Sequence, residues 1–342
     1  MSDKGTVLVT GGSGYIGSWC VIAALQQGYA VRTTVRNLAK APQARAAIER
    51  QTDPGNRLSF HAVDLTADAG WDEAVAGCEY VLHVASPIAV AEPKDPDELI
   101  VPAREGARRA VGAAIKAGVK RVVLTSSVAA ASPGESGADS LTDESVWTNL
   151  DEPRLSAYAK SKTLAERAAW DLVSAAGGAT TLATVNPALV LGPVLSDDFS
   201  GSIQVLERLM TGRVPGLPRL GFNVVDVRDV ADLHLRAMTQ PEAAGQRFIA
   251  AGQWAWMADL AALLKAKLSP EEAAKVPTRK VPDFVLRLAG LFDRDIASVT
   301  GGLGRKHDFS SAKAQTLLGW KPRPLEETAL DCARSLVAAG VA

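Results

Sequence analysis

The sequence predicts an α/β protein built on a doubly wound parallel sheet. Short β-branched apolar runs alternate with longer segments of helical period, and glycines such as Gly28 and Gly118 stand where helices should end. In such a sheet, ligands bind beyond the carboxyl ends of the strands. Strands are expected at 6–10, 30–36, 57–63, 80–85, 121–126 and 181–186, and helices near 15–27, 38–50, 71–76, 97–117 and 158–176.

The alternation loosens after about residue 190, where prolines and glycines punctuate the chain. A strand near 247–251 and a final helix near 325–338 are still expected. We therefore expect residues 1–190, with interleaved later segments at about 222–252, to form a cofactor-binding domain. Residues 191–342 should form mainly a smaller C-terminal lobe that binds substrate.

Composition narrows the class of protein. The 342 residues are 47% hydrophobic with a formal net charge of -1, which favours a compact globular protein and gives no basic stripe for nucleic acid. Three scattered cysteines fit reduced thiols and argue against a disulfide framework or a metal site. The apolar segment at 284–292 is about half the length of a membrane span, and the N-terminus lacks the apolar run of a signal peptide. A cytoplasmic protein without nucleic-acid or membrane partners is expected.

A glycine-rich turn follows the first strand. In VTGGSGYIGSW, Gly11, Gly14 and Gly17 stand between a strand and a helix that begins near Tyr15. Glycines here permit a tight turn and close backbone approach, so that a pyrophosphate can lie on the positive N-terminus of the helix. This context indicates nucleotide binding in a Rossmann-type domain rather than a merely flexible turn.

Arg36 stands at the end of the second strand, where NAD-binding proteins place a carboxylate that holds the ribose 2′-hydroxyl. A cation there suits a 2′-phosphate, and no Asp or Glu occurs from Gly28 to Gln43, so NADP is favoured. Arg32, on the same strand face, and Lys40 are candidates to assist. After the third strand, Asp64 and Leu65 could hold the adenine, or Asp64 could simply cap the next turn; both interpretations remain open.

Tyr158 and Lys162 are spaced by four residues on a predicted helix and should therefore be neighbours. A nearby ammonium favours the phenolate, so we expect Lys162 to lower the pKa of Tyr158 and to let it exchange a proton with a carbonyl or hydroxyl oxygen. At the carboxyl end of the fifth strand, Ser126 or Ser127 could donate a hydrogen bond to the same oxygen.

In this order, VTGGSGYIGSW, YAVRTTVRN, GCEYVLHVASP, RVVLTSSV, YAKSKTLAE, NPALVLGP, VDVRDVADLH and LLGWKPRPLEE resemble the extended short-chain dehydrogenase/reductases. Within them the likeness is to the branch of dihydroflavonol, cinnamoyl-CoA and related aldehyde reductases. The resemblance implies NADPH/NADP as cofactor, Ser127, Tyr158 and Lys162 as the catalytic triad, and a monomer or homodimer. Lys162 would also hold the nicotinamide ribose. The cofactor residues implied are Gly11, Ser13, Gly14, Tyr15, Ile16, Gly17, Arg36, Lys40, Asp64, Leu65, Val84, Ala85, Ser86, Thr125, Tyr158, Lys162, Pro187, Val190 and Ser202.

The leading hypothesis is an NADPH-dependent reductase of aldehydes or ketones, reversible to an alcohol dehydrogenase. A nucleotide-sugar epimerase or dehydratase shares the fold and triad, although such enzymes hold NAD. A steroid-type dehydrogenase is a nearer variant, and a non-catalytic NADP sensor is disfavoured because such proteins usually lose the Tyr–Lys pair. Ser132 stands where dihydroflavonol reductases carry a ring-binding asparagine, and the small residues of VAAASPGESG suggest a less polar pocket wall, so a generic carbonyl is favoured over a flavonoid.

Several other polar residues are expected to be structural. Asn186 precedes a proline after the sixth strand, and His83 and His234 lie in apolar elements. Within VDVRDVADLH, we expect Asp229 to cap the following helix, and Asp226 and Arg228 to organise the lobe.

Overall fold

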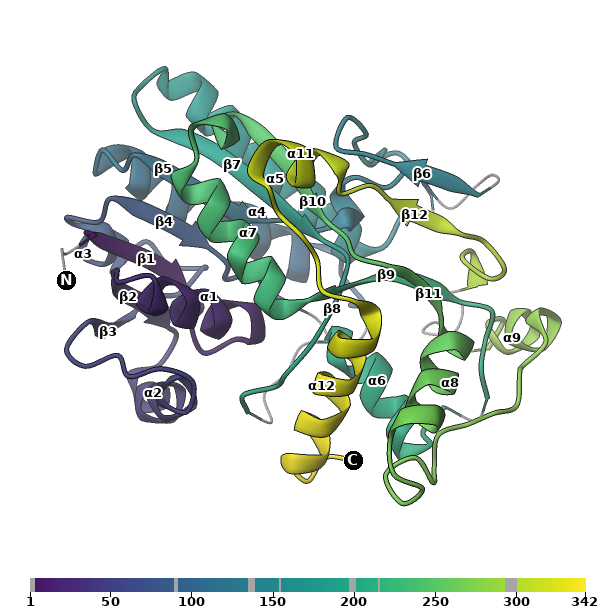
Figure 1. Cartoon of the computed structure of the whole chain (residues 1–342). Coiled ribbons are helices and arrows are strands. Elements are labelled where there is room, and N and C mark those ends of the chain that lie inside the picture. Colours follow the sequence, from purple (N-terminus) through teal and green to yellow (C-terminus); the bar gives the residue numbers. More distant parts are fainter. Residues whose placement is uncertain are drawn as a thin grey trace.

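The computed structural model describes residues 4–88, 92–134, 139–153, 155–196, 201–214, 216–292 and 300–342. Its centre is a seven-stranded, fully parallel sheet in the order β10-β7-β5-β4-β1-β2-β3 (Figure 1). Every strand expected from the sequence is present to within two residues at either end, which confirms the predicted doubly wound class. The strands are β1 (Thr6–Thr10), β2 (Ala30–Val35), β3 (Leu58–Ala62), β4 (Tyr80–His83), β5 (Arg121–Thr125), β7 (Thr181–Pro187) and β10 (Gln246–Ala250).

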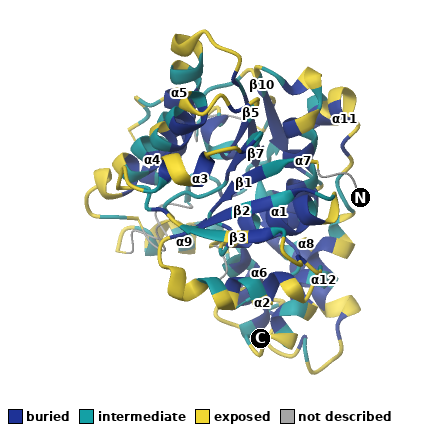
Figure 2. Cartoon of the chain, turned by 90° about the vertical axis from the view of Figure 1, so that its left-hand side faces the viewer, coloured by how far each residue is buried: buried dark blue, intermediate teal, exposed yellow. Residues whose placement is uncertain are grey.

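Helices cover both faces of this sheet. One face carries α1 (Tyr15–Gln26), α2 (Ala41–Glu49), α7 (Val227–Thr239) and α11 (Ala312–Leu318), and the other carries α3 (Trp71–Val75), α4 (Asp97–Lys116) and α5 (Ala157–Ala176). Figure 2 shows most of the central strands buried and the outer helix surfaces exposed, whereas the edge strand β3 is only partly buried. A short 3₁₀ turn, Leu38–Lys40, precedes α2, and Pro42 lies in the first turn of α2, a position that proline tolerates.

The strand order reverses between β1 and β4, which lie side by side although two strands separate them in sequence. The connections from these two strands leave in opposite directions along the sheet, so a crevice forms at their carboxyl ends. The segments that follow β1 and β4 therefore meet at the expected ligand position.

The later part of the chain builds two small sheets beside the large one. A three-stranded sheet is formed by β8 (Leu189–Leu191), β9 (Gly221–Asp226) and β11 (Trp254–Trp256), and β6 (Ser140–Thr142) pairs with β12 (His307–Phe309). Between β9 and β11, the chain returns to the large sheet through α7 and β10. The remaining α-helices within the described ranges are α6 (Gly201–Thr211), α8 (Met257–Lys267), α9 (Asp283–Ala289) and α12 (Leu325–Ala338), the last with the predicted bounds. The domain boundary at about residue 190 stays a prediction.

The prediction that Asp229 caps α7 is wrong. The cap is Asp226, whose side chain accepts a hydrogen bond from the backbone N–H of Arg228, while Asp229 lies inside the first turn. Asp229 instead accepts from Arg323, because the segment before α12 passes over this end of α7. Arg228 bonds to both Asp226 and Asp331, so its expected organising role is confirmed.

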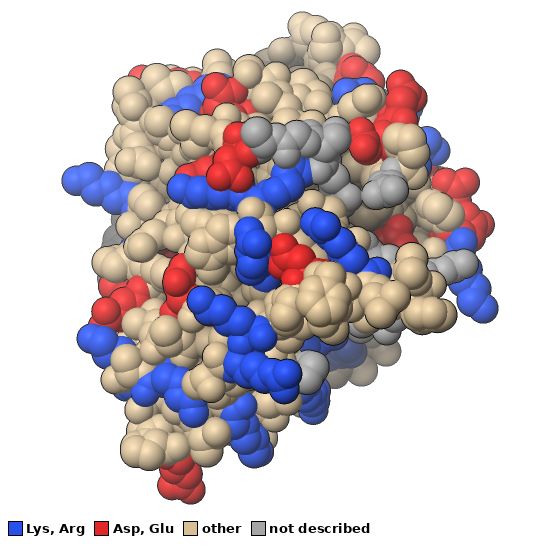
Figure 3. Space-filling model, turned by 90° about the vertical axis from the view of Figure 1, so that its right-hand side faces the viewer, with Lys and Arg blue, Asp and Glu red and all other residues tan. Residues whose placement is uncertain are grey.

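Charged side chains on the face that carries α9 include both signs, with uncharged surface between them (Figure 3). No helix within the described residues combines the length and apolarity that crossing a bilayer would require. The expectations of no nucleic-acid partner and of a cytoplasmic location stay predictions.

Candidate active site

The turn between β1 and α1 is shaped by its glycines. Gly11 has a φ of +72°, and a Cβ on Gly17 would lie 2.1 Å from the carbonyl oxygen of Gly11. The N-cap of α1 is Gly14, which has no side chain to bond to the first helical N–H groups. These donors are therefore left for an anion, as a pyrophosphate cradle requires. Thr34, which the sequence analysis missed, accepts a 3.0 Å hydrogen bond from the N–H of Gly11 and holds this turn against β2.

A cavity of about 520 Å³ opens at the carboxyl ends of the strands, a volume within the usual range of ligand sites. All the predicted catalytic and cofactor residues line it, except Lys40. They come from segments that are far apart in the sequence and are gathered by the strand order described above. Further lining residues, which the sequence analysis did not single out for the site, include Thr34, Val63, Thr66, Trp71, Pro87, Ile88, Pro102 and Ala188.

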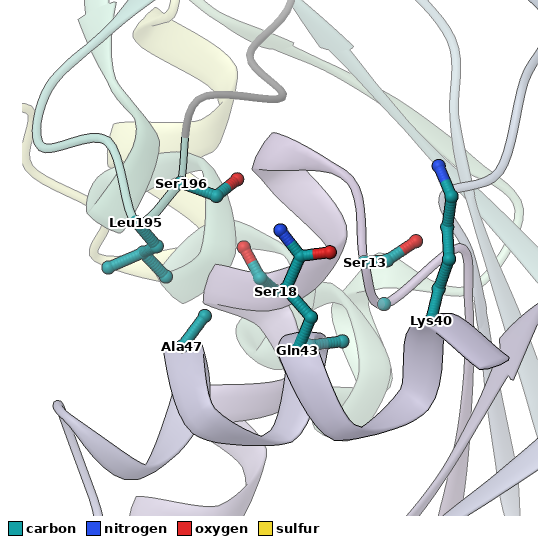
Figure 4. Close-up of a pocket in the computed structure, with 9 residues that line it drawn as sticks. Ser13, Ser18, Lys40, Gln43, Ala47, Leu195 and Ser196 are labelled. Carbon is teal, nitrogen blue, oxygen red and sulfur yellow. The ribbon is translucent and has the colours of Figure 1, made fainter. Parts of the chain in front are cut away.

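Lys40 borders a small adjoining pocket together with Ser13, and Ser13 lines both spaces. Figure 4 shows the Ser13 hydroxyl directed toward the side of this pocket that carries Lys40. Arg36 is exposed at the end of β2 and lines the large cavity. Two cations and a hydroxyl thus surround the outer end of the glycine turn.

Arg32 is not available to assist Arg36, which corrects one of the expectations. Its guanidinium donates to the carbonyl oxygens of Glu73, Ala74 and Ala76 at the end of α3, at 2.8 to 3.1 Å. The last carbonyls of a helix lack partners within the helix and attract a cation. Arg32 is therefore held on the side of α3, away from the cavity.

Asp64 makes the turn-capping contacts that were one of its two interpretations. Its Oδ1 accepts from the backbone N–H of Thr66 at 2.8 Å and from the Thr66 hydroxyl at 2.7 Å. These bonds, with smaller contributions from Arg36 and Arg109, lower the pKa of Asp64. Asp64 and Leu65 also line the cavity, so the adenine role is compatible with this cap and stays a prediction.

Tyr158 and Lys162 lie one turn apart at the start of α5, which Ser156 caps through a 3.1 Å hydrogen bond from the N–H of Ala159. The Nζ of Lys162 donates to the carbonyl oxygen of Thr125 at 3.3 Å and lies 6.0 Å from the centre of the Tyr158 ring. Both side chains line the cavity beside the glycine turn. Their proximity was correctly predicted from the spacing.

The expected lowering of the Tyr158 pKa is wrong for this structure. Burial raises the pKa of Tyr158, and a hydrogen bond with Ser127 offsets only part of that effect. Burial also lowers the pKa of Lys162 to about 8, against the opposing influence of Glu166. The phenol is therefore protonated at neutral pH, as a proton donor must be.

The two serines after β5 have different partners. The Ser126 hydroxyl donates to Glu166 at 2.5 Å, whereas the Ser127 oxygen accepts from the N–H of Ala129 at 3.1 Å. That acceptor bond orients the Ser127 hydroxyl and leaves its proton free for another acceptor. Because Ser127 also contacts Tyr158, it is the serine placed to act with the phenol.

The polar residues expected to be structural are buried and hydrogen-bonded. His83 bonds to the Thr10 hydroxyl at 2.9 Å, and His234 bonds to the Thr125 hydroxyl at 2.7 Å. Burial lowers the pKa of His83 to about 3 and that of His234 to about 4, so both are neutral. Asn186 is fully buried and donates to the Ser127 carbonyl oxygen, which confirms a structural role directly behind the site.

Ser132 does not line the cavity among the described residues. Its hydroxyl accepts from the N–H of Gly134 at 3.3 Å, and its own N–H donates to Thr148. The last residues of the VAAASPGESG segment, from 135 on, lie outside the described residues. Within the described ranges, no cluster of three or more His, Cys, Asp or Glu side chains is arranged to hold a metal ion.

The sequence analysis missed a buried ion pair beneath the site, formed by Glu166 of α5 and Arg247 of β10, with Nε and Oε1 2.7 Å apart. Glu166 stands four residues after Lys162, on the same helix face, inside the YAKSKTLAE segment. Arg247 precedes the apolar residues Phe248, Ile249 and Ala250 of its strand. A charged residue on the buried face of a helix and another buried in a strand were the signals that could have revealed the pair.

The sheet, the glycine turn and the Tyr158–Lys162 pair are those of an extended short-chain dehydrogenase/reductase. Comparison with known proteins agrees: residues 7–251 match the NAD dependent epimerase/dehydratase family. The chain is 37% identical to cinnamoyl-CoA reductase 2 of Arabidopsis thaliana, over 72% of this chain and 73% of that protein. It is also 37% identical to dihydroflavonol 4-reductase of Zea mays, over 77% and 74%.

Among solved structures, yeast methylglyoxal/isovaleraldehyde reductase Gre2 complexed with NADPH is similar, with a TM-score of 0.80 and 27% identity. The match covers 98% of this chain and 100% of Gre2. The chain belongs to the NAD dependent epimerase/dehydratase family.

Proposed function

We propose that this protein is an NADPH-dependent reductase that converts aldehydes or ketones to alcohols. The observation that carries the proposal is the convergence of Ser127, Tyr158 and Lys162 on one cavity with the glycine turn and Arg36. A nucleotide site beside a hydroxyl pair and a buried lysine is suited to hydride transfer coupled to proton transfer. The three relatives named above are reductases, which supports the same chemistry.

The cavity fits a dinucleotide phosphate. Only glycine is accommodated at position 17, and the open N-terminus of α1 suits the pyrophosphate. Arg36, Lys40 and Ser13 surround the position for a 2′-phosphate, while Val84, Ala85, Pro187 and Val190 would border the inner half of the cofactor. Bound NADPH supplies the hydride that reaches the carbonyl carbon.

The chain's own groups act on the carbonyl oxygen. Tyr158, kept protonated by burial, donates its phenolic proton as negative charge develops there. Ser127, oriented by the N–H of Ala129, donates a second hydrogen bond to the same oxygen. The Lys162 ammonium, one turn away, stabilises the phenolate left after proton transfer.

Among the described residues, those that we expect to border the substrate carbon chain are uncharged. Beyond Ser127 and Tyr158, these residues are Ser86, Pro87, Ile88 and Ala188. Ile88 is 58% exposed, so an apolar side chain borders the open side. These surroundings favour a neutral carbonyl compound over one that carries a carboxylate or phosphate close to the reacting carbon. We propose that the smaller lobe provides the remaining contacts.

The alternatives are weaker. A nucleotide-sugar epimerase or dehydratase belongs to the same family and uses the same triad, but Arg36 at the end of β2 disfavours tightly held NAD. A steroid-type dehydrogenase would also take a neutral substrate and is distinguished only by the size of the carbonyl compound. A non-catalytic NADP sensor would not require the Tyr158–Lys162 pair.

The test is NADPH consumption, with NADH in parallel, over a panel of aryl and alkyl aldehydes, ketones and β-ketoesters. Each neutral aldehyde is paired with a carboxylated analogue. We expect turnover that prefers NADPH, with the neutral member of each pair at least about tenfold better in kcat/KM, a difference of about 1.4 kcal/mol. Cofactor binding without turnover of any carbonyl, together with conversion of a nucleotide sugar, would replace the proposal with the epimerase.

A further inference from the structure

Glu166 is the centre of a buried hydrogen-bond network beneath the reacting groups. Its side chain is fully buried and accepts from the hydroxyl of Ser126, the hydroxyl of Thr184 at 2.9 Å and the amide of Asn186 at 2.9 Å. These donors come from β7 and from the residue directly after β5, two neighbouring strands of the large sheet. One carboxylate therefore fixes helix α5 to the two strands that end at the site.

Arg247 completes the network from the next strand. It is the register partner of Thr184, so its side chain lies on the same face of the sheet. Besides Glu166, its guanidinium donates to the carbonyl oxygens of Glu144 at 2.7 Å, Val146 at 2.8 Å and Ala130 at 3.2 Å. This set of acceptors matches the fixed fork of the guanidinium.

The first connection to the chemistry runs through the backbone of Ser127. Asn186, held by Glu166, donates to the Ser127 carbonyl oxygen at 3.1 Å. Ser127 caps a 3₁₀ turn, Val128–Ala130, and the far end of that turn is held by Arg247. The ion pair thus anchors both ends of the short turn that orients the Ser127 hydroxyl.

The second connection is electrostatic and reaches Lys162. Glu166 lies one turn after Lys162 on α5. Burial lowers the pKa of Lys162 to about 8, and the negative charge of Glu166 opposes this effect. The other titratable groups around the ammonium are Tyr158 on α5 and the neutral His83 on β4. β5 contributes the uncharged carbonyl oxygen of Thr125, and the positive charge of Arg247 on β10 is compensated by Glu166.

Stability alone is a weak reason for such a pair. Removing two charges from water costs several kcal/mol, and well-packed apolar residues often stabilise a core equally well. We propose that Glu166, with Arg247, is a positioning residue for carbonyl reduction, which fixes Ser127 through Asn186 and places a negative charge one helical turn from Lys162. This inference rests on the proposed function and deepens it.

The decisive variant is Glu166→Gln, which keeps the size of the side chain and removes its charge. With Arg247 no longer compensated, the pKa of Lys162 falls. The alkaline limb of the kcat profile should therefore move to lower pH, by on the order of one unit. Displacement of Ser127 should lower kcat by about 10- to 100-fold, with NADPH affinity changed less than about threefold.

The matched control is Glu207→Gln on α6. Glu207 is also a buried helical carboxylate, paired with Arg213 at 3.0 Å, but it lies outside the site. The Glu207→Gln substitution should lower the melting temperature without changing kcat or its pH profile. If Glu166→Gln has the same kcat and pH profile as Glu207→Gln, while the wild-type protein reduces carbonyls, the positioning role is overturned. The proposed function would still stand.

Two further variants separate the connections and serve if Glu166→Gln does not fold. Asn186→Ala leaves the ion pair intact, so it should lower kcat at least about tenfold with an unmoved alkaline limb. Glu166→Asp keeps the negative charge, so the alkaline limb of its kcat profile should lie at the same pH as in the wild-type protein. Full kcat in Asn186→Ala would overturn the connection through Ser127. Failure of the wild-type protein to reduce any carbonyl would instead refute the proposed function.

Discussion

Substitution of Tyr158 by phenylalanine is expected to lower kcat for carbonyl reduction by about 10²- to 10⁴-fold. The phenol is the protonated group beside Ser127, and burial keeps it protonated through the neutral pH range. Phenylalanine retains the ring and its packing, so the cavity stays intact. NADPH affinity, measured by fluorescence titration, should change by less than about threefold.

The matched control for Tyr158→Phe is Tyr80→Phe. Tyr80 begins β4 at the opposite end of the sheet, where its ring packs edge-on against Tyr29. It should keep wild-type kcat. A Tyr158→Phe protein that retained a third or more of wild-type kcat would show that another group delivers the proton.

Replacement of Arg36 by aspartate should reverse the cofactor preference. The change removes charge-assisted hydrogen bonds to a 2′-phosphate and adds like-charge repulsion, so NADPH affinity should fall by about 100-fold or more. NADH carries no 2′-phosphate, and the new carboxylate can accept from its ribose hydroxyl. Its affinity should therefore stay within about fivefold of wild type.

Arg32→Gln provides the control on the same strand. Because Arg32 bonds to the end of α3, its loss should lower the melting temperature and leave the ratio of NADPH to NADH affinity unchanged. Equal losses of NADPH and NADH affinity in Arg36→Asp would show that Arg36 does not recognise the 2′-phosphate.

The predictable parts of this protein are those with local signals. The strands carry short apolar runs, the phosphate turn has its glycine spacing, and Tyr158 and Lys162 are neighbours by helical periodicity alone. The strand order then collects their ends at one cavity, because ligand sites of doubly wound sheets lie at the carboxyl edge.

The parts that escaped prediction depend on contacts between distant segments. Asp226 caps α7, whereas Asp229 accepts from Arg323, a partner almost a hundred residues later in the sequence. Arg32 donates to carbonyl oxygens at the end of α3, and no sequence pattern around Arg32 indicates this contact. The raised pKa of Tyr158 follows from burial, which spacing on a helix does not specify.

The network of Glu166 and Arg247 escaped for a similar reason. Its members lie on α5, on β7 and β10 and directly after β5, and the two charged residues are 81 positions apart in the sequence. In the sequence, each of these residues taken alone looks like an ordinary polar residue. Their common role becomes visible only when β5, β7 and β10 lie side by side under α5.

The most direct test of the central claim is deuteride transfer from 4-deuterated NADPH to a neutral aldehyde, read by mass spectrometry of the alcohol. Both stereospecifically labelled forms of the cofactor are used, with Tyr158→Phe as control. We expect one of the two labelled cofactors to transfer a single deuterium to the alcohol carbon. This transfer should be lost in the Tyr158→Phe variant. NADPH that binds but leaves no deuterium in any product would contradict the assignment of this site to carbonyl reduction.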